Sequence, residues 1–77
     1  MPDERDCMAL AEVAIKLGSG SYDERSIAIQ LIRKMGDLGC IKALAKVIEC
    51  LGRGSYDERR VASIAIEVLD HCKKTCI

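Results

Sequence analysis

The stretch GSGSYDER at residues 18–25 returns as GRGSYDER at residues 52–59, an offset of 34 residues. Working outward from it, residues 6–36 align without gaps to residues 40–70, with 14 identities in 31 pairs. Self-similarity at a fixed period is the signature of a repeat architecture. The chain is therefore predicted to hold two copies of one structural unit.

Each copy is predicted to be a helix, a turn and a second helix. Glycine interrupts the helical pattern at Gly18 and Gly52, and we expect left-handed helix ends there. Ser21 and Glu24 fit a capping box, in which the hydroxyl accepts from the N3 amide and the carboxylate accepts from the N-cap amide. The second copy repeats this pair as Ser55 and Glu58.

The expected fold is all-α, with four antiparallel helices as two tandem helix-turn-helix repeats. Gly36-Asp37 is expected to end one helix and cap the next. The helices are expected at about 3–17, 22–35, 38–51 and 56–74. Short connections make successive helices antiparallel neighbours. We expect one domain over residues 1–77, with repeat 1 at about 6–36 and repeat 2 at about 40–70, as a closed bundle or a short α-solenoid.

Composition excludes several classes of function. Twelve basic and twelve acidic side chains balance to zero net charge, which leaves no electrostatic footprint for nucleic acid or an anionic membrane. Two tyrosines are the only aromatic residues, so the core must be aliphatic. No run reaches the roughly 18 apolar residues of a membrane helix. Residues 1–6 are too acidic for a secretory signal, so we expect a cytoplasmic protein, or one that exists only as a recombinant product.

A 34-residue two-helix unit has the length of a tetratricopeptide repeat, and Gly36-Asp37 resembles the turn of that family. The family's aromatic positions and terminal proline are missing, so no peptide-binding residues are implied. The chain is more similar to computationally designed helical repeat proteins, which share the repeated caps, short Gly/Ser loops and all-aliphatic cores. That resemblance implies a de novo scaffold with no cofactor.

Four cysteines are expected at one end of the bundle: Cys7, Cys40, Cys72 and Cys76. They could be small buried hydrophobic residues, or they could form one or two disulfides, for instance Cys40–Cys72 or Cys7–Cys76. A third interpretation is a metal site beside His71. Tetrahedral zinc takes four such ligands, but no Cys-x-x-Cys motif is present.

No catalytic constellation is visible in the sequence. His71 is the only histidine, and its place near a helix C-terminus favours an interaction with the helix dipole. No Ser or Cys has an identifiable base and orienting group. We expect the protein not to be an enzyme.

Residues 28–37 have the spacing of the pro-apoptotic helix motif that docks into the groove of Bcl-2-family proteins. The resemblance rests on Ala28, Ile32, Met35 and Gly36-Asp37, and it implies a protein-binding module. Gly-Asp is also a common helix stop and start, so a purely structural role is the alternative.

Differences between the copies suggest where a partner could bind. Gln30 is replaced by Ile64, and Lys34 by Val68, so the last helix is more apolar than its counterpart. A surplus apolar stripe on a terminal helix is typical of a partner surface. The alternative is that this helix is the most central one of a bundle. The predicted homodimer interface comprises Val61, Ile64, Ala65, Val68 and Cys72. It lies beside the residues of this helix that are expected to face the core, Ala62, Ile66 and Leu69.

The sequence thus favours a non-catalytic helical scaffold whose partner is a second copy of itself or none. A protein-binding module and a metal-binding protein are the two alternatives.

Overall fold

The structure, a computed structural model, describes residues 3–75 and contains four helices within that range. They are α1 (Glu4–Gly18), α2 (Tyr22–Leu38), α3 (Ile41–Leu51) and α4 (Tyr56–Thr75). The described residues form no strand, and the predicted all-α fold is confirmed. None of the described helices is long and apolar enough to cross a bilayer.

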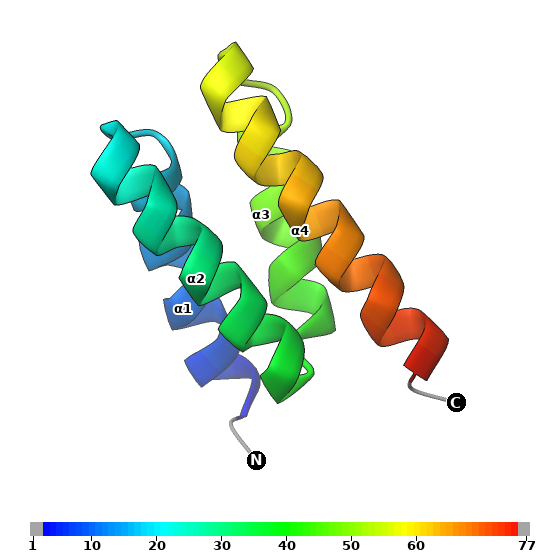
Figure 1. The fold of residues 1–77 in the computed structure, drawn as a ribbon. Coiled ribbons are helices and arrows are strands. Elements are labelled where there is room, and N and C mark those ends of the chain that lie inside the picture. The colour runs from blue at the N-terminus through cyan, green and yellow to red at the C-terminus, as the bar shows by residue number, and fades with distance from the viewer. Residues whose placement is uncertain (1–2, 76–77) are drawn as a thin grey trace.

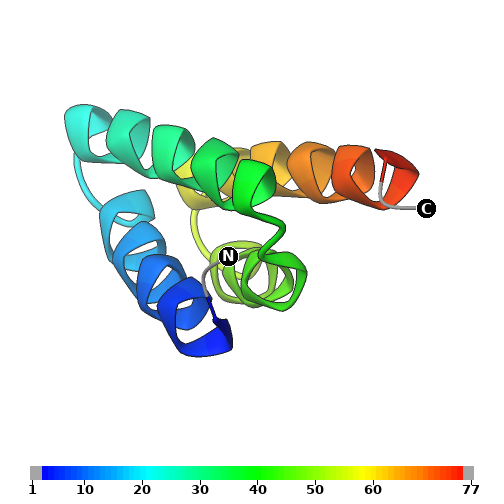
Figure 2. The ribbon, with the colours of Figure 1, turned by 90° about the horizontal axis from the view of Figure 1, so that it is seen from below.

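The two hairpins lie side by side, as Figure 1 shows. The α1–α2 and α3–α4 turns lie at one end of the molecule, and the α2–α3 connection lies at the other end (Figure 1). Seen from below, α2 and α4 form one layer and α1 and α3 form the other (Figure 2). Each helix therefore packs on its hairpin partner and on the equivalent helix of the other repeat. The result is a small all-α bundle made of two stacked hairpins.

Aliphatic side chains of all four helices fill the space between the layers. The largest fully buried ones are Ile32, Met35, Leu44, Val47, Leu51 and Val61. Among the described residues no polar or charged side chain is buried. Small side chains lie among them, and Ala11, Ala14 and Ala28 are completely inaccessible.

The starts of α2 and α4 agree with the capping-box predictions. Ser21 N donates to Glu24 Oε1 at 3.0 Å and Glu24 N donates to Ser21 Oγ at 3.4 Å, which completes the capping box of α2. The second repeat has the same pair of bonds between Ser55 and Glu58, at 3.0 and 3.3 Å. Asp3 caps α1 by accepting from the amide of Asp6.

The predicted end of the second helix is wrong. α2 continues through Gly36 and Asp37 to Leu38, and Gly39 ends it with φ of 77°. The next helix begins at Ile41 after Cys40, which makes no side-chain cap. Asp37 therefore does not cap α3. Gly39 adopts the left-handed backbone conformation that residues with a side chain disfavour, and α2 ends at this point.

The left-handed helix ends expected at Gly18 and Gly52 are also wrong, because Gly39 is the single described residue with positive φ. Gly18 is the last residue of α1 and serves close packing instead. A Cβ on Gly18 would lie 2.7 Å from Leu51 Cδ1 of the other repeat. Glycine at this position thus lets repeat 2 approach repeat 1, which is a tertiary requirement rather than a local one.

Candidate interaction surface and inter-repeat contacts

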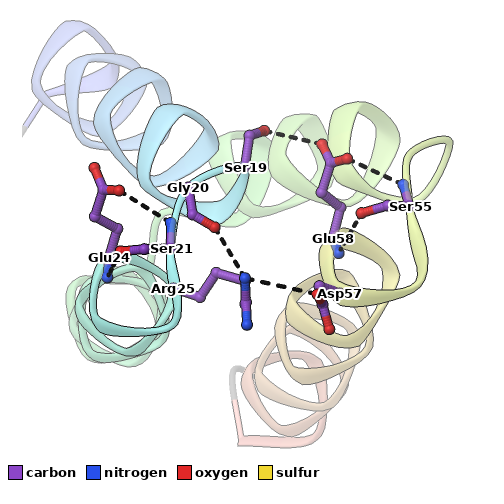
Figure 3. A network of polar contacts seen from close by, with 8 residues as sticks. All are labelled: Ser19, Gly20, Ser21, Glu24, Arg25, Ser55, Asp57 and Glu58. Carbon is purple, nitrogen blue, oxygen red and sulfur yellow. Dashed lines mark hydrogen bonds and ion pairs between the residues drawn. The ribbon is translucent and has the colours of Figure 1, made fainter.

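Polar contacts join the two hairpins at the end where both turns lie (Figure 3). Ser19 Oγ, in the first turn, donates to Glu58 Oε2 at 2.9 Å. Glu58 also accepts from the amide of Ser55 through its other oxygen. One carboxylate therefore caps its own helix and holds the neighbouring repeat.

Arg25 makes the second polar contact between the repeats (Figure 3). Its Nη1 donates to the carbonyl oxygen of Gly20 at 2.9 Å and lies 3.7 Å from Asp57 Oδ2. The guanidinium is partly buried, whereas the Asp57 side chain is about half exposed, so solvent screens this ion pair. Sequence reasoning did not assign Arg25 a role. The repeated pentapeptide was a signal that could have drawn attention to it.

The hydrogen bonds lower the pKa of both capping glutamates. For Glu58 the largest cause is the donated amide of Ser55, followed by the hydroxyls of Ser19 and Ser55. For Glu24 the causes are the amide and then the hydroxyl of Ser21. Donated hydrogen bonds stabilise the ionised carboxylate, which is why the pKa falls. Glu58 differs from its counterpart by the extra bond from the other repeat.

A shallow pocket of about 160 Å³ lies between α2 and α4 beside these contacts. Small-molecule sites are usually clefts of about 300–1,000 Å³. The pocket is therefore too small to carry a ligand proposal. It is lined mainly by Tyr22, Arg25, Asp57, Arg60 and Ile64.

The cysteines are paired differently from either pairing suggested by the sequence. Cys7, at the start of α1, forms a disulfide with Cys40, just before α3, with a Cα–Cα distance of 5.5 Å. This bond excludes both Cys40–Cys72 and Cys7–Cys76, because each of those needs a sulfur already bonded. The pairing arises because α1 and α3 lie next to each other in the same layer, which the sequence alone did not decide.

Of the other three cysteines, the structure describes Cys50 and Cys72. Cys72 is buried and its Sγ donates to the carbonyl oxygen of Gly36 at 3.2 Å. Cys50 is exposed on α3. Cys76 lies outside the described residues. Within residues 3–75, no three His, Cys, Asp or Glu side chains gather in a way that could hold a metal ion.

The stripe predicted as an exposed interface on α4 is largely internal. Val61, Ala65 and Cys72 are buried within the chain, and Ile64 and Val68 are half-buried. A Cβ added to Gly36 of α2 would collide with Val68 Cγ1, so this stripe packs against α2. The prediction of an exposed stripe is therefore wrong.

The prediction that Ala62, Ile66 and Leu69, on the adjacent side of α4, face the core needs correction as well. Ile66 is half exposed and Leu69 is only partly buried, whereas Ala62 is buried as expected. The physical reason is the stacking of hairpins. It turns the side of α4 that bears Val68 towards α2 and leaves Ile66 at the outer end of the stack.

The segment that resembles the pro-apoptotic motif lies on the inner side of α2. Ala28, Ile32 and Met35, which would be its docking residues, are fully buried in the core. Only Asp37 of the motif is exposed. The folded chain therefore does not present these apolar residues to a partner, and the spacing serves the protein's own packing.

Equivalent residues of the two repeats differ systematically in exposure on one side. Val47 is fully buried at 0% exposure, whereas its counterpart Val13 is 49% exposed. Val61 is 2% exposed and its counterpart Ile27 is 51% exposed. The hairpins are alike, so the neighbouring repeat makes the difference. We call the open side of repeat 1 the leading face, which comprises Ala9, Val13, Leu17 and Ile27.

The other side shows the reverse pattern. Ile32 is fully buried in repeat 1, and its counterpart Ile66 is 51% exposed. Ala11 is buried and its counterpart Ala45 is exposed. Repeat 1 is covered here by repeat 2, while none of residues 3–75 covers this side of repeat 2. We call this open side the trailing face, which comprises Ala45, Gly52 and Ile66.

Comparison of the chain with protein-family models, with curated proteins and with solved structures gives no match. Its functional interpretation therefore depends on the residues and their packing.

Proposed function

We propose that this protein is a non-catalytic helical-repeat scaffold that acts by packing its helix faces against other protein surfaces, in the first place those of its own copies. The observation that carries the proposal is the exposure of apolar side chains at both ends of the stack. Terminal repeats of monomeric solenoids have polar outer faces, and here Val13 and Ile66 stand at those ends.

The chemistry of the polar residues supports the same proposal. Glu24 and Glu58 have a lowered pKa, and the hydrogen bonds that they accept explain this shift. Charged side chains with perturbed pKa values gather at catalytic sites when burial or like charges shift them. Here hydrogen bonds are the larger cause for both glutamates, and the weaker effect of burial opposes the shift. The similarity to designed helical repeat proteins is a further reason to propose a scaffold.

Solution mass as a function of protein concentration tests the proposal. Sedimentation velocity or light scattering should show reversible association over about 1 µM to about 1 mM, the range in which weak protein contacts are populated. The association should persist in reductant, because the disulfide joins two residues of one chain. A monomer throughout that range would overturn the proposal. Association that vanishes in reductant while the helical circular dichroism is kept would assign it to intermolecular disulfides instead.

A further inference from the structure

The two open faces of the molecule are related by the same 34-residue shift that relates its repeats. Repeat 2 uses its Val47 and Val61 side to cover repeat 1, and the counterparts of these residues form the leading face. Repeat 1 uses its Ala11 and Ile32 side, whose counterparts lie on the trailing face. Each end of the molecule therefore exposes a face equivalent to one side of the interface between its two repeats.

We propose that copies of this chain stack head to tail, with the trailing face of one copy against the leading face of the next, repeating the contact between its own two repeats. The inference deepens the self-association proposed above and rests on it. It can be checked residue by residue, because every contact inside the chain names the pair that would meet between copies.

The closest apolar contact is reproduced without change of residue type. Inside the chain, Gly18 accommodates Leu51, with only 2.7 Å between the Leu51 Cδ1 atom and a Cβ built on the glycine. The shift of 34 residues turns this pair into Gly52 of one copy and Leu17 of the next. Gly52 is exposed and Leu17 is half-buried. A leucine at the leading face thus meets a glycine at the trailing face, as it does internally.

The hydrogen bond from Ser19 to Glu58 becomes a charged pair. The counterpart of Ser19 is Arg53, and the counterpart of Glu58 is Glu24. Internally, Glu58 caps its helix with Oε1 and accepts from the neighbouring repeat with Oε2. Glu24 caps α2 with its own Oε1 in the same way. Its second oxygen is thereby placed to accept from the arginine of another copy, and a charged donor makes this the stronger bond.

The ion pair between Arg25 and Asp57 also has an opposite-charge counterpart. Arg59 of one copy would face Asp23 of the next, and both side chains are exposed. The steric contact between Gly36 and Val68 maps onto Asp70 and Lys34, another pair of opposite sign. Three independent positions are therefore complementary in charge across the proposed contact. None of these three pairs brings two charges of the same sign together.

Several internal contacts are not reproduced, among them the two that follow, and their loss limits the strength of the association. The disulfide between Cys7 and Cys40 maps onto Ile41 and Asp6, which cannot bond covalently. The leading face also has Gln30 where repeat 2 has Ile64. The contact between copies is therefore weaker than the one within the chain, reversible, and centred on the layer of α1 and α3. A heterologous contact of this kind extends into an open stack unless the rotation closes.

Two lysine variants separate this arrangement from a two-fold dimer. Val13→Lys places a charge in the leading face, and Ile66→Lys places one in the trailing face. Both residues are about half exposed in the monomer, so each variant should keep the helical circular dichroism of the wild type. Each alone should associate at least about tenfold more weakly, because an apolar contact is replaced by a buried charge. Glu12→Lys is the matched control, since both Glu12 and its counterpart Lys46 are exposed.

Mixing the two variants is the decisive measurement. Each keeps one intact face, so the mixture should form a 1:1 heterodimer that grows no further, while the wild type grows beyond the dimer with concentration. If either variant still forms a homodimer, or if the mixture stays monomeric while the wild type associates, head-to-tail stacking is overturned and the scaffold proposal stands. A wild type that is monomeric throughout overturns both.

Arg53→Glu provides a test that does not disturb an apolar face. Arg53 lies in an exposed turn, and the change would place a glutamate against Glu24 of the next copy. Association should weaken, and added salt should restore part of it by screening the repulsion. An Arg53→Glu protein that associates as tightly as the wild type at low salt would contradict the proposed pairing.

Discussion

Repeat 1 and repeat 2 share nearly half of their aligned residues, yet identical residues have opposite environments in the two copies. Ile32 lies in the core and Ile66 at an open end, while Val47 is buried and Val13 is exposed. Both repeats are helical hairpins whose second helix begins with the same capping box. The difference teaches that the neighbouring repeat, and not the repeat's own sequence, decides which of its residues are buried, since each repeat is covered on one side only.

The largest expected effect comes from truncating the same isoleucine in both repeats. Ile32→Ala should lower the free energy of unfolding by about 2–5 kcal/mol, because it leaves a cavity in a packed core. Ile66→Ala should lower it by at most about 1 kcal/mol, because half of the side chain is already in water. Urea denaturation at a concentration where the wild type is monomeric measures both.

Ile32→Ala could unfold a chain of this size completely, so a milder pair keeps the comparison measurable. Ile32→Val should cost about 0.5–1.5 kcal/mol, and Ile66→Val should be close to neutral. Equal losses at the two positions would show that the stack does not bury repeat 1 more deeply than repeat 2 at this site.

An intermediate effect is expected from the disulfide, which joins the repeats at the end opposite to the polar contacts. Cys7→Ala combined with Cys40→Ala should lower the free energy of unfolding by about 2–4 kcal/mol, since closing a loop of this length restricts the unfolded chain. Wild-type protein in reductant should lose a similar amount. The control is Cys50→Ala, which removes an exposed thiol and should change little. Destabilisation by the control alone would contradict the assigned pairing.

The smallest effect concerns the two capping glutamates and is read by titration. Both carboxyls have a lowered pKa in the folded state, so the stability they contribute is present above the ordinary glutamate pKa of about 4.3 and is lost as pH falls through the lower folded value. Glu58 has the additional bond from Ser19 and should titrate at the lower pH of the two. Carboxyl NMR shifts across this pH range measure both values.

Ser19→Ala is the matched variant for that comparison. It removes the hydroxyl that reaches Glu58 from the other repeat and leaves the capping box of each helix intact. The pKa of Glu58 should rise toward that of Glu24, and the pKa of Glu24 should not move. If the pKa of Glu58 is unchanged in this variant, the bond between the repeats does not persist in solution.

Local features were predictable because their causes are local. The capping boxes at Ser21 and Ser55 depend on residues three positions apart, and the structure has both. The end of α2 was mistaken because Gly36-Asp37 has the composition of a helix stop, whereas Gly36 is there to make room for Val68 of the other repeat. The sequence alone does not distinguish a glycine required for packing between repeats from a glycine that ends a helix.

The sequence by itself determined the duplication, the four helices and their antiparallel order, because period, caps and short turns act within a few residues of one another. Only the tertiary structure decided that α1 lies against α3, that Cys7 pairs with Cys40, and that α4 turns the Val68 side inward and the Ile66 side outward. Two hairpins with apolar residues on more than one side can stack in more than one way, and the choice depends on contacts between residues more than thirty positions apart.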